Sequence, residues 1–230
     1  MAEFFETSVF FGVTVSLAAY YVGYLLNKKT GWGFLNPLLV SIAATIAVLL
    51  AGRIPYDTYY NGAKYLSYLL TPATVCLAVP LYEKLQLLKD NWKAIIAGIL
   101  SGVVTSLLCV LVMALLFGFT HAEYVTFLPK SITTAIGMGV AEELGGYGTL
   151  AAAVIIITGV IGNMIAPAFL KLCRIEEPIA KGIGIGSASH AVGTAKAMEM
   201  GTTEGAMSSL SIVVSGLLTV IGASVFAGFI

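Results

Sequence analysis

Residues 182–205, which read GIGIGSASHAVGTAKAMEMGTTEG, carry the residue types of this chain that are best suited to chemistry. The segment holds His190, one of only two histidines, together with Lys196 and two glutamates among glycine, alanine, serine and threonine. The sequence on either side is strongly apolar. Polar and ionisable groups are costly in hydrocarbon and persist mainly where they line a cavity or pathway. We therefore expect a functional site in this segment.

The hydroxyl and ionisable side chains of this segment predict an anion site. Ser187 or Ser189 is expected to cap a helix start, which leaves backbone N–H groups and a positive dipole end facing a cavity. Such helix ends bind carboxylates. His190 can reach Thr194 at helical spacing, and it is a candidate for proton coupling because its charge changes near neutral pH. Lys196 is expected to assist with its positive charge.

Each of these residues also has a simpler interpretation. His190 can be a hydrogen-bonded packing residue, and Lys196 can snorkel to the interface or pair with Glu199 three positions later. Ser187 and Ser189 are too near His190 for a usual nucleophile–base arrangement, and no GxSxG or HExxH motif is present. We therefore do not expect an enzyme.

A second group of polar residues lies outside this segment. It comprises Thr133, Thr134, Glu142, Glu143 and Asn163. The two threonines open a small-residue helix and are expected to supply hydroxyls and a second helix N-terminus, with capping alone as the alternative. The glutamates end that helix, either in an outer vestibule with a coupling or gating role or in a solvated turn. Asn163 lies in an apolar run and is expected to hydrogen-bond another helix.

The composition is that of a polytopic membrane protein. Of 230 residues, 58% are hydrophobic and only 10% are charged, against about 25% charged residues in soluble domains. A formal net charge of zero argues against a nucleic-acid partner. The acidic start MAEFFETS predicts no cleaved leader. The three cysteines match no metal or disulfide spacing and are expected to pack as small core hydrophobes, and we expect no metal and no cofactor.

We expect an all-α fold with about six spanning helices and additional broken or re-entrant segments. A helix needs about 20 apolar residues to cross a bilayer. Five runs qualify, namely 7–26, 32–52, 94–118, 149–170 and 206–229. A sixth, 64–82, contains Pro72 and Pro80 and should be kinked or partly unwound.

The basic residues set the expected orientation. They form three clusters, Lys28–Lys29, Lys84–Lys93 and Lys171–Lys181. Short basic loops usually face the cytoplasm. All three clusters face one side only if the N-terminus is outside and 131–145 is re-entrant rather than spanning. The C-terminus is then cytoplasmic.

A rough internal echo predicts an inverted repeat within a single membrane domain, 1–230. In each of three segments a small-residue start is followed by a glutamate twelve positions later; the pairs are Thr71 and Glu83, Ser131 and Glu143, and Ser187 and Glu199. Chance recurrence of small polar residues is the alternative. We divide the domain into an N-terminal helix pair, 1–60, and two repeat-related regions with broken segments; the regions are 61–120 and 121–230, and the segments are 71–83, 131–145 and 182–203. Interrupted helices meeting near the midplane are typical of transporters.

Three stretches of sequence resemble the LrgB family. They are PKSITTAIGMGVAEELGG at 129–146, APAFLKLCRIEEPIAKG at 166–182 and GSASHAVGTAKAMEMGTTEGAMS at 186–208. NPLL at 36–39 fits as well, and the resemblance covers nearly the whole chain. It implies a small bacterial inner-membrane protein that works beside an LrgA or holin-like membrane protein. Family members are described as antiholin- or holin-like modulators of murein hydrolases, as facilitators of pyruvate uptake and, in plastids, as carriers of glycolate and glycerate.

This sequence departs from the family pattern at two places. The common TTPIAME is TTAIGMG here, which loses a proline at Ala135 and an acid at Gly139. Lys196 stands where arginine is common, and lysine lacks the bidentate fork that suits a carboxylate.

Two functions from different classes follow from the sequence. The leading hypothesis is a carrier for small organic anions, with a pyruvate- or glycolate-like monocarboxylate held between Thr133–Thr134 and Ser187–His190. The alternative is a holin/antiholin-like protein that modulates murein hydrolase activity and lysis by oligomerising in the lipid bilayer. Either function implies a homo-oligomer, an LrgA-like partner, or both.

Overall fold

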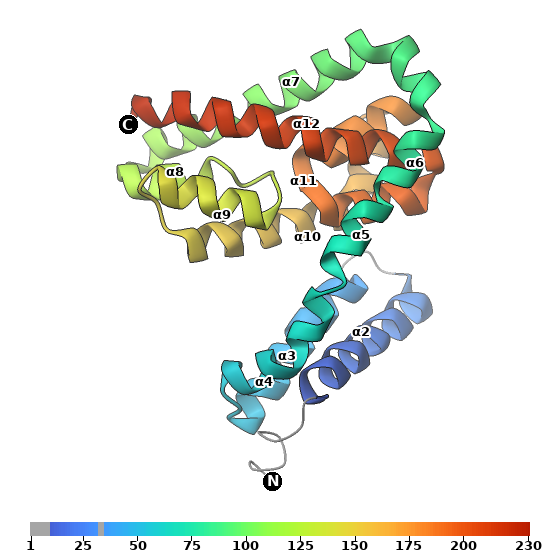
Figure 1. The fold of residues 1–230 in the computed structure, drawn as a ribbon, viewed down its shortest axis with the longest axis vertical. Coiled ribbons are helices and arrows are strands. Elements are labelled where there is room, and N and C mark those ends of the chain that lie inside the picture. The colour runs from blue at the N-terminus through green and yellow to red at the C-terminus, as the bar shows by residue number, and fades with distance from the viewer. Residues whose placement is uncertain (1–9, 32–34) are drawn as a thin grey trace. The chain divides into compact units, whose positions relative to one another are not determined.

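The protein is helical throughout the part that the structure describes, residues 10–31 and 35–230, with no strand in those ranges (Figure 1). The coordinates are those of a computed structural model. Contacts group the chain into two compact units, residues 1–76 and 77–230, which we describe one at a time. The boundary falls inside the segment 71–83. The starts of the expected spans 7–26 and 32–52 lie outside the described residues.

The first unit contains a helical hairpin followed by two further helices. It contains α2 (Phe11–Thr30), α3 (Pro37–Gly52), α4 (Tyr56–Ser67) and α5 (Leu70–Cys76). The side chain of Asn36 caps α3 by accepting the Leu38 N–H at 2.9 Å, and Pro37 occupies the first turn, where its missing N–H costs nothing. Helix α2 packs on both α3 and α4. The Ser16 and Tyr59 hydroxyls hydrogen-bond at 2.7 Å across the α2–α4 contact.

The prolines interrupt the helix in 64–82 as expected. Helix α4 ends at Ser67, α5 covers Leu70–Cys76 and α6 covers Ala78–Glu83. Each interruption lies within four residues before Pro72 or Pro80. Proline removes the bond to the carbonyl four residues earlier and crowds that turn, so the chain breaks there.

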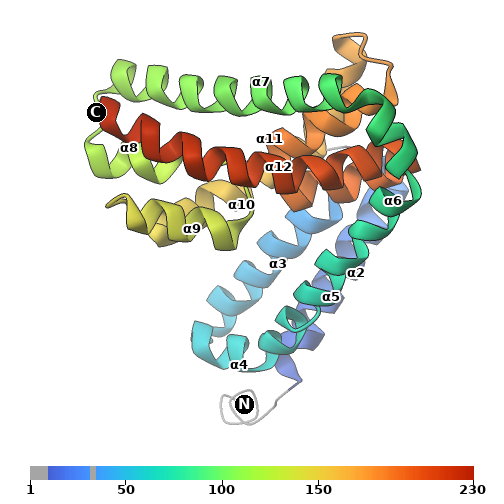
Figure 2. The same ribbon diagram turned by 45° about the horizontal axis from the view of Figure 1, so that its top comes forward.

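The second unit is built around two long helices, α7 (Leu85–Phe117) and α12 (Thr202–Phe226), which lie beside each other (Figure 2). The buried residues of α7 repeat every three or four positions; they are Ile95, Ile99, Val103, Leu107, Val110 and Ala114. This stripe forms the main apolar core. The buried residues of α12 include many small ones, among them Ser208, Ser211 and Ser215, which allow close helix packing.

Four helical stretches among the described residues are long and apolar enough to cross a membrane. They are Tyr56–Glu83, Leu85–Phe117, Gly148–Leu172 and Thr202–Phe229. Three of them match the runs predicted at 94–118, 149–170 and 206–229, and the first contains the interrupted run. Helix α2 is not in this set, and α3 has 16 residues, which rise about 24 Å against a hydrocarbon core of about 30 Å.

The segment between α7 and α10 (Gly148–Leu172) turns back on itself. It contains α8 (His121–Phe127) and α9 (Thr134–Glu143). His121 Nε2 lies 3.1 Å from the Leu144 carbonyl oxygen, so the start of α8 meets the end of α9. With ten residues, α9 rises about 15 Å, half of a bilayer core. Helix α9 is therefore too short to span the core, and the re-entrant path of 131–145 stays a prediction.

Helix α8 begins at a capping-box sequence, TxxE. Thr120 and Glu123 form a capping box, in which the Thr120 N–H donates to the Glu123 carboxylate at 2.8 Å. This backbone hydrogen bond holds the pKa of Glu123 below its usual value. The start of α8 is thus fixed by its own local sequence.

Candidate functional site

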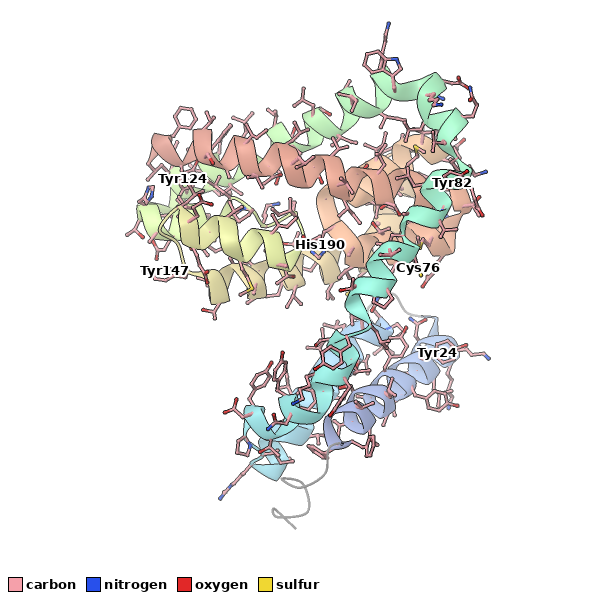
Figure 3. All side chains as sticks on the ribbon, viewed as in Figure 1. Tyr24, Cys76, Tyr82, Tyr124, Tyr147 and His190 are labelled. Atoms are coloured by element: carbon pink, nitrogen blue, oxygen red, sulfur yellow. The ribbon has the colours of Figure 1, made fainter. Side chains whose placement is uncertain are left out.

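The candidate site lies at a break in the middle of α11 (Pro178–Met200). Two residues leave the helical conformation, Ser189 with φ −132° and ψ 15°, and His190 with φ 43° and ψ −142°. Both are buried. The polar segment 182–203 therefore forms two half-helices that meet inside the second unit, where Figure 3 labels His190.

Glycines on α10 make room for the break. A methyl group built on Gly159 would lie 2.6 Å from His190 Nε2, and one on Gly162 would overlap the Ser189 hydroxyl. The two glycines are three positions apart and face the same helix. The backbone of α10 thus approaches the α11 break more closely than any larger residue would allow.

The imidazole of His190 is anchored to α10. Its Nε2 lies 2.9 Å from the Ile155 carbonyl oxygen. A carbonyl only accepts hydrogen bonds, so Nε2 carries the hydrogen. His190 is therefore the hydrogen-bonded residue of its simpler interpretation, and it also lies at the centre of the break.

Ser187 does not cap a helix start, contrary to expectation. Its hydroxyl donates to the Ile183 carbonyl at 2.7 Å, one turn earlier in the same half-helix. Serine inside a helix commonly bonds back in this way because that acceptor is the nearest one. The break follows two residues later, at Ser189.

Thr194 joins α11 to α12. Its hydroxyl donates to the backbone oxygen of His190 at 2.9 Å and lies 2.7 Å from the Ser208 hydroxyl. Both hydroxyls are buried. Thr194 therefore contacts the backbone of His190 rather than its ring, and it holds the second half-helix against α12.

The charge of Lys196 is directed at Glu199. Their side chains form an ion pair of 2.8 Å, three residues apart, and are 32% and 68% exposed. This is the alternative that the spacing offered. Exposed pairs contribute little stability, but the carboxylate neutralises the lysine that was expected to assist at the break.

Four of the remaining predicted residues lie at the two ends of α9. Thr133 is the N-cap residue of α9 without a side-chain capping bond, and Thr134 begins the helix; both are half-buried. Glu142 and Glu143 are exposed at the other end, beside a turn in which Gly145 has φ 89°. That position matches the solvated-turn interpretation. Helix α9 contacts α10 beside the site, where the Ile155 side chain packs at Gly137.

Asn163 bonds to a second helix, as expected. Its Nδ2 donates to the Val192 carbonyl at 2.8 Å, two residues beyond the break. Asn163 therefore links α10 to the start of the second half-helix.

Replacing Asn163 with leucine should lower stability by about 1 kcal/mol, the usual size of a polar contact between membrane helices. Thermal unfolding of the purified protein in detergent measures the effect. Met164→Leu, a neighbouring change of similar volume, is the control. Equal melting temperatures for the two variants would show that the bond contributes nothing.

The structure adds residues that the sequence did not single out. Lys130 and Ser131 lie in the turn before α9 and, with Ser106 and Ser187, line a cavity of about 470 Å³ between α7 and α11. The polar residues of α7 recur on one face at helical spacing, which is the signal that could have found them. The expectation that the cysteines pack in the core was wrong. All three are exposed, because in a membrane protein the outer surface is apolar too.

Comparison with known proteins places the chain among relatives. Residues 16–229 match the LrgB-like family. The chain is 37% identical, over 222 residues and 96% of both chains, to the antiholin-like protein LrgB of Bacillus cereus (strain B4264). The corresponding protein of Bacillus anthracis (strain A0248) is similar to the same extent. No solved structure matches the chain.

Proposed function

We propose, since this chain belongs to the LrgB-like family, that it is an antiholin-like membrane protein that modulates murein hydrolase activity and lysis. The observation that carries this proposal is the similarity to relatives named antiholin-like, which extends over 96% of both chains. The apolar helices long enough to cross a bilayer are consistent with it. The carrier hypothesis, which the sequence favoured, has weaker support from these names.

A second function, passage of small organic anions, is favoured by one structural observation. The break at Ser189–His190 places irregular backbone inside a membrane unit, and such backbone is tolerated only where protein buries it or a cavity adjoins it. Interrupted helices of this kind form the binding sites of many transporters. In this function His190 and the neighbouring hydroxyls would contact a monocarboxylate.

The membrane orientation follows from the basic clusters and is part of the same proposal. Asn91 and Ala94 near the start of α7 line one cavity with Glu177 and Ala180, which follow α10. The clusters Lys84–Lys93 and Lys171–Lys181 therefore lie at the same end of the second unit. We place that end in the cytoplasm of a bacterial cell, with the protein in the inner membrane. The backbone oxygen of the C-terminal Ile230 lies 2.7 Å from His121 Nδ1, just beyond the far end of α7, so the C-terminus lies at the opposite, outer end of the second unit. The expectation of a cytoplasmic C-terminus was therefore wrong, because α12 runs from the end with the basic clusters towards α8.

Reconstitution distinguishes the two functions. Proteoliposomes would contain a holin-like partner with or without this chain, and release of an uncharged dye would be measured. The antiholin-like function predicts that this chain reduces dye release several-fold and that labelled pyruvate shows no saturable counterflow.

The opposite result would support the carrier. A carrier would give saturable counterflow with this chain alone, and His190→Ala would reduce it about tenfold or more. A tenfold reduction corresponds to a loss of about 1.4 kcal/mol of binding or transition-state stabilisation. Dye release that does not respond to this chain would exclude the antiholin-like function.

A further inference from the structure

The turn between α8 and α9 carries a lysine that neither proposed function uses. We propose that Lys130 binds a small monovalent oxyanion in the cavity between α7 and α11, which we call the α7–α11 cavity. Its volume is about 470 Å³, within the range of small-molecule sites. The hydroxyl residues that line it are Ser101, Thr105, Ser106, Ser131 and Ser187.

The ammonium group of Lys130 is placed by these hydroxyls. Lys130 Nζ donates to the Ser131 Oγ at 3.1 Å, and Ser131 Oγ lies 3.2 Å from Ser106 Oγ on α7. An ammonium has three donors, and Ser131 accepts one of them. The group therefore retains donor capacity at the wall of the cavity.

No carboxylate neutralises this charge in the part of the chain that the structure describes, where Lys196–Glu199 is the one ion pair. Ser106 lies midway along the apolar run 94–118, so Lys130 reaches the middle depth of α7. A cation at that depth needs a partner, and lysines in such positions mark ion or substrate pathways. An anion in the cavity would be that partner.

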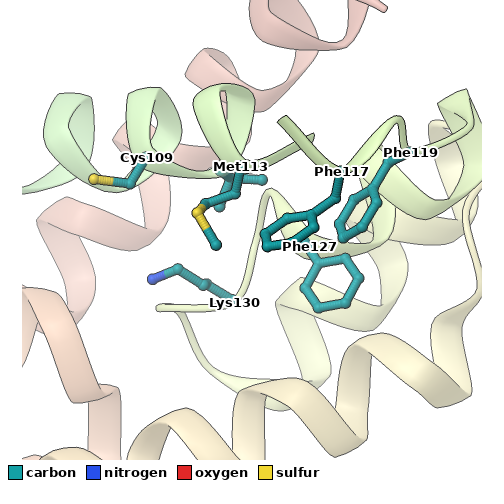
Figure 4. A pocket seen from close by; sticks show the side chains of 7 residues that line it. Cys109, Met113, Phe117, Phe119, Phe127 and Lys130 are labelled. Atoms are coloured by element: carbon teal, nitrogen blue, oxygen red, sulfur yellow. The ribbon is translucent and has the colours of Figure 1, made fainter. Parts of the chain in front are cut away.

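The aliphatic stem of Lys130 packs against apolar side chains on the side away from the α7–α11 cavity. Lys130 also lines a cavity of about 230 Å³ that contains Phe117, Phe119 and Phe127, and Figure 4 shows its nitrogen at the end directed away from these rings. A long lysine stem commonly covers apolar surface while the ammonium reaches a polar region. The ammonium is therefore directed to the hydroxyl-lined cavity.

The chemistry of the cavity selects the ligand class. One lysine balances one negative charge. Ser101 and Ser187 donate their hydroxyl hydrogens to the Gly98 and Ile183 carbonyls, whereas Ser106 can accept from Ser131 and donate to an oxygen of the anion without adding charge. Gly102 lets Ser187 approach α7 closely, since a methyl group there would lie 3.0 Å from Ser187 Oγ. A compact oxyanion with one charge, such as a short monocarboxylate, fits these groups. The site belongs to the second unit, and it rests on the anion-passage function for the class of its ligand while adding residues that this function did not name.

Cys109 provides a direct readout because it lines both cavities beside Lys130 and carries a free thiol. In full-length protein with Cys76→Ser and Cys173→Ser, the rate of Cys109 modification by uncharged methyl methanethiosulfonate is measured. Acetate, pyruvate or nitrate is added at an ionic strength held constant with a bulky sulfonate. We expect at least one of these anions to slow the modification of Cys109 in a saturable way. Comparing acetate and pyruvate with nitrate shows whether the site prefers a carboxylate or an inorganic oxyanion.

Substitutions of Lys130 then test its role. Lys130→Met should weaken the protecting anion about tenfold or more, whereas Lys130→Arg, which keeps the charge, should retain protection. Lys93→Met, on exposed α7 surface, removes the same charge and should change nothing. If Lys130→Met does not fold, Ser106→Ala replaces it, with about threefold weaker protection expected from the loss of one hydroxyl.

Two outcomes would overturn the proposal. One is that none of the three anions protects Cys109 in otherwise unchanged protein. The other is that protection is as strong in Lys130→Met, or in Ser106→Ala, as with the native residues. Neither outcome depends on transport or lysis, so failure of this site is distinguishable from failure of the proposed function.

Discussion

Replacing His190 with glycine is expected to give a more stable protein than replacing it with alanine. His190 has φ 43° and ψ −142°, a conformation that glycine adopts readily and residues with a Cβ do not. Such strain costs about 1–3 kcal/mol. Both variants lose the 2.9 Å hydrogen bond to the Ile155 carbonyl. The difference between their free energies of unfolding therefore reports the backbone strain at position 190. We expect glycine to be favoured by about 1–2 kcal/mol in thermal or chemical unfolding.

A control within the same helix has the opposite sign. Ala195 lies in the second half-helix, is exposed and has ordinary helical conformation. There alanine is favoured over glycine by about 1 kcal/mol, so Ala195→Gly should destabilise. If glycine at position 190 were also the less stable residue, α11 would be continuous through the site, and the structural support for an anion pathway would be lost.

Adding a methyl group at Gly186 is expected to destabilise the protein, whereas the same change at Gly184 is not. A Cβ on Gly186 would lie 2.8 Å from the Ser208 Cα and closer still to its carbonyl oxygen, so α11 and α12 would have to separate. Overpacking of this kind costs about 1–3 kcal/mol. A backbone contact cannot be relieved by a rotamer change, which favours the upper end of this range.

Gly184 is the matched control because it lies two residues away on the same half-helix. No atom lies within 4 Å of a Cβ built there. Gly184→Ala should therefore be neutral or stabilise by up to about 1 kcal/mol through helix propensity. Melting temperatures of the two variants in detergent measure the contrast. Equal shifts would mean that α11 and α12 do not pack closely at Ser208.

Most helix positions follow from the sequence because their causes are local. Three apolar runs coincide with helices, because hydropathy over about 20 residues decides a span. The run 94–118 ends one residue beyond α7, 149–170 lies within α10, and 206–229 covers most of α12 and the short 3-10 helix Ala227–Phe229 that follows it. Pro72 and Pro80 predict the interruptions near them. The N-cap residues Asn36 and Thr120 are also local causes, since each side chain bonds to a residue at most three positions away. The inverted repeat and the single domain stay predictions.

The partners of polar side chains depended on which helices come together. The sequence marked 182–203 as broken but not the break residues, because Ser189 and His190 leave the helix where α10 presents Gly159 and Gly162. Local geometry equally allowed Ser187 to cap a helix or bond back, and the helix continued past it.

The sequence by itself thus determined that this chain is a helical membrane protein of the LrgB-like family and where its polar segment lies. Only the tertiary structure decided that Lys130 meets Ser106 on α7, through Ser131, at one cavity. The physical reason is range. Hydropathy, proline breaks and caps act over a few residues, whereas a buried charge is defined by side chains far apart in sequence, and only packing brings those together.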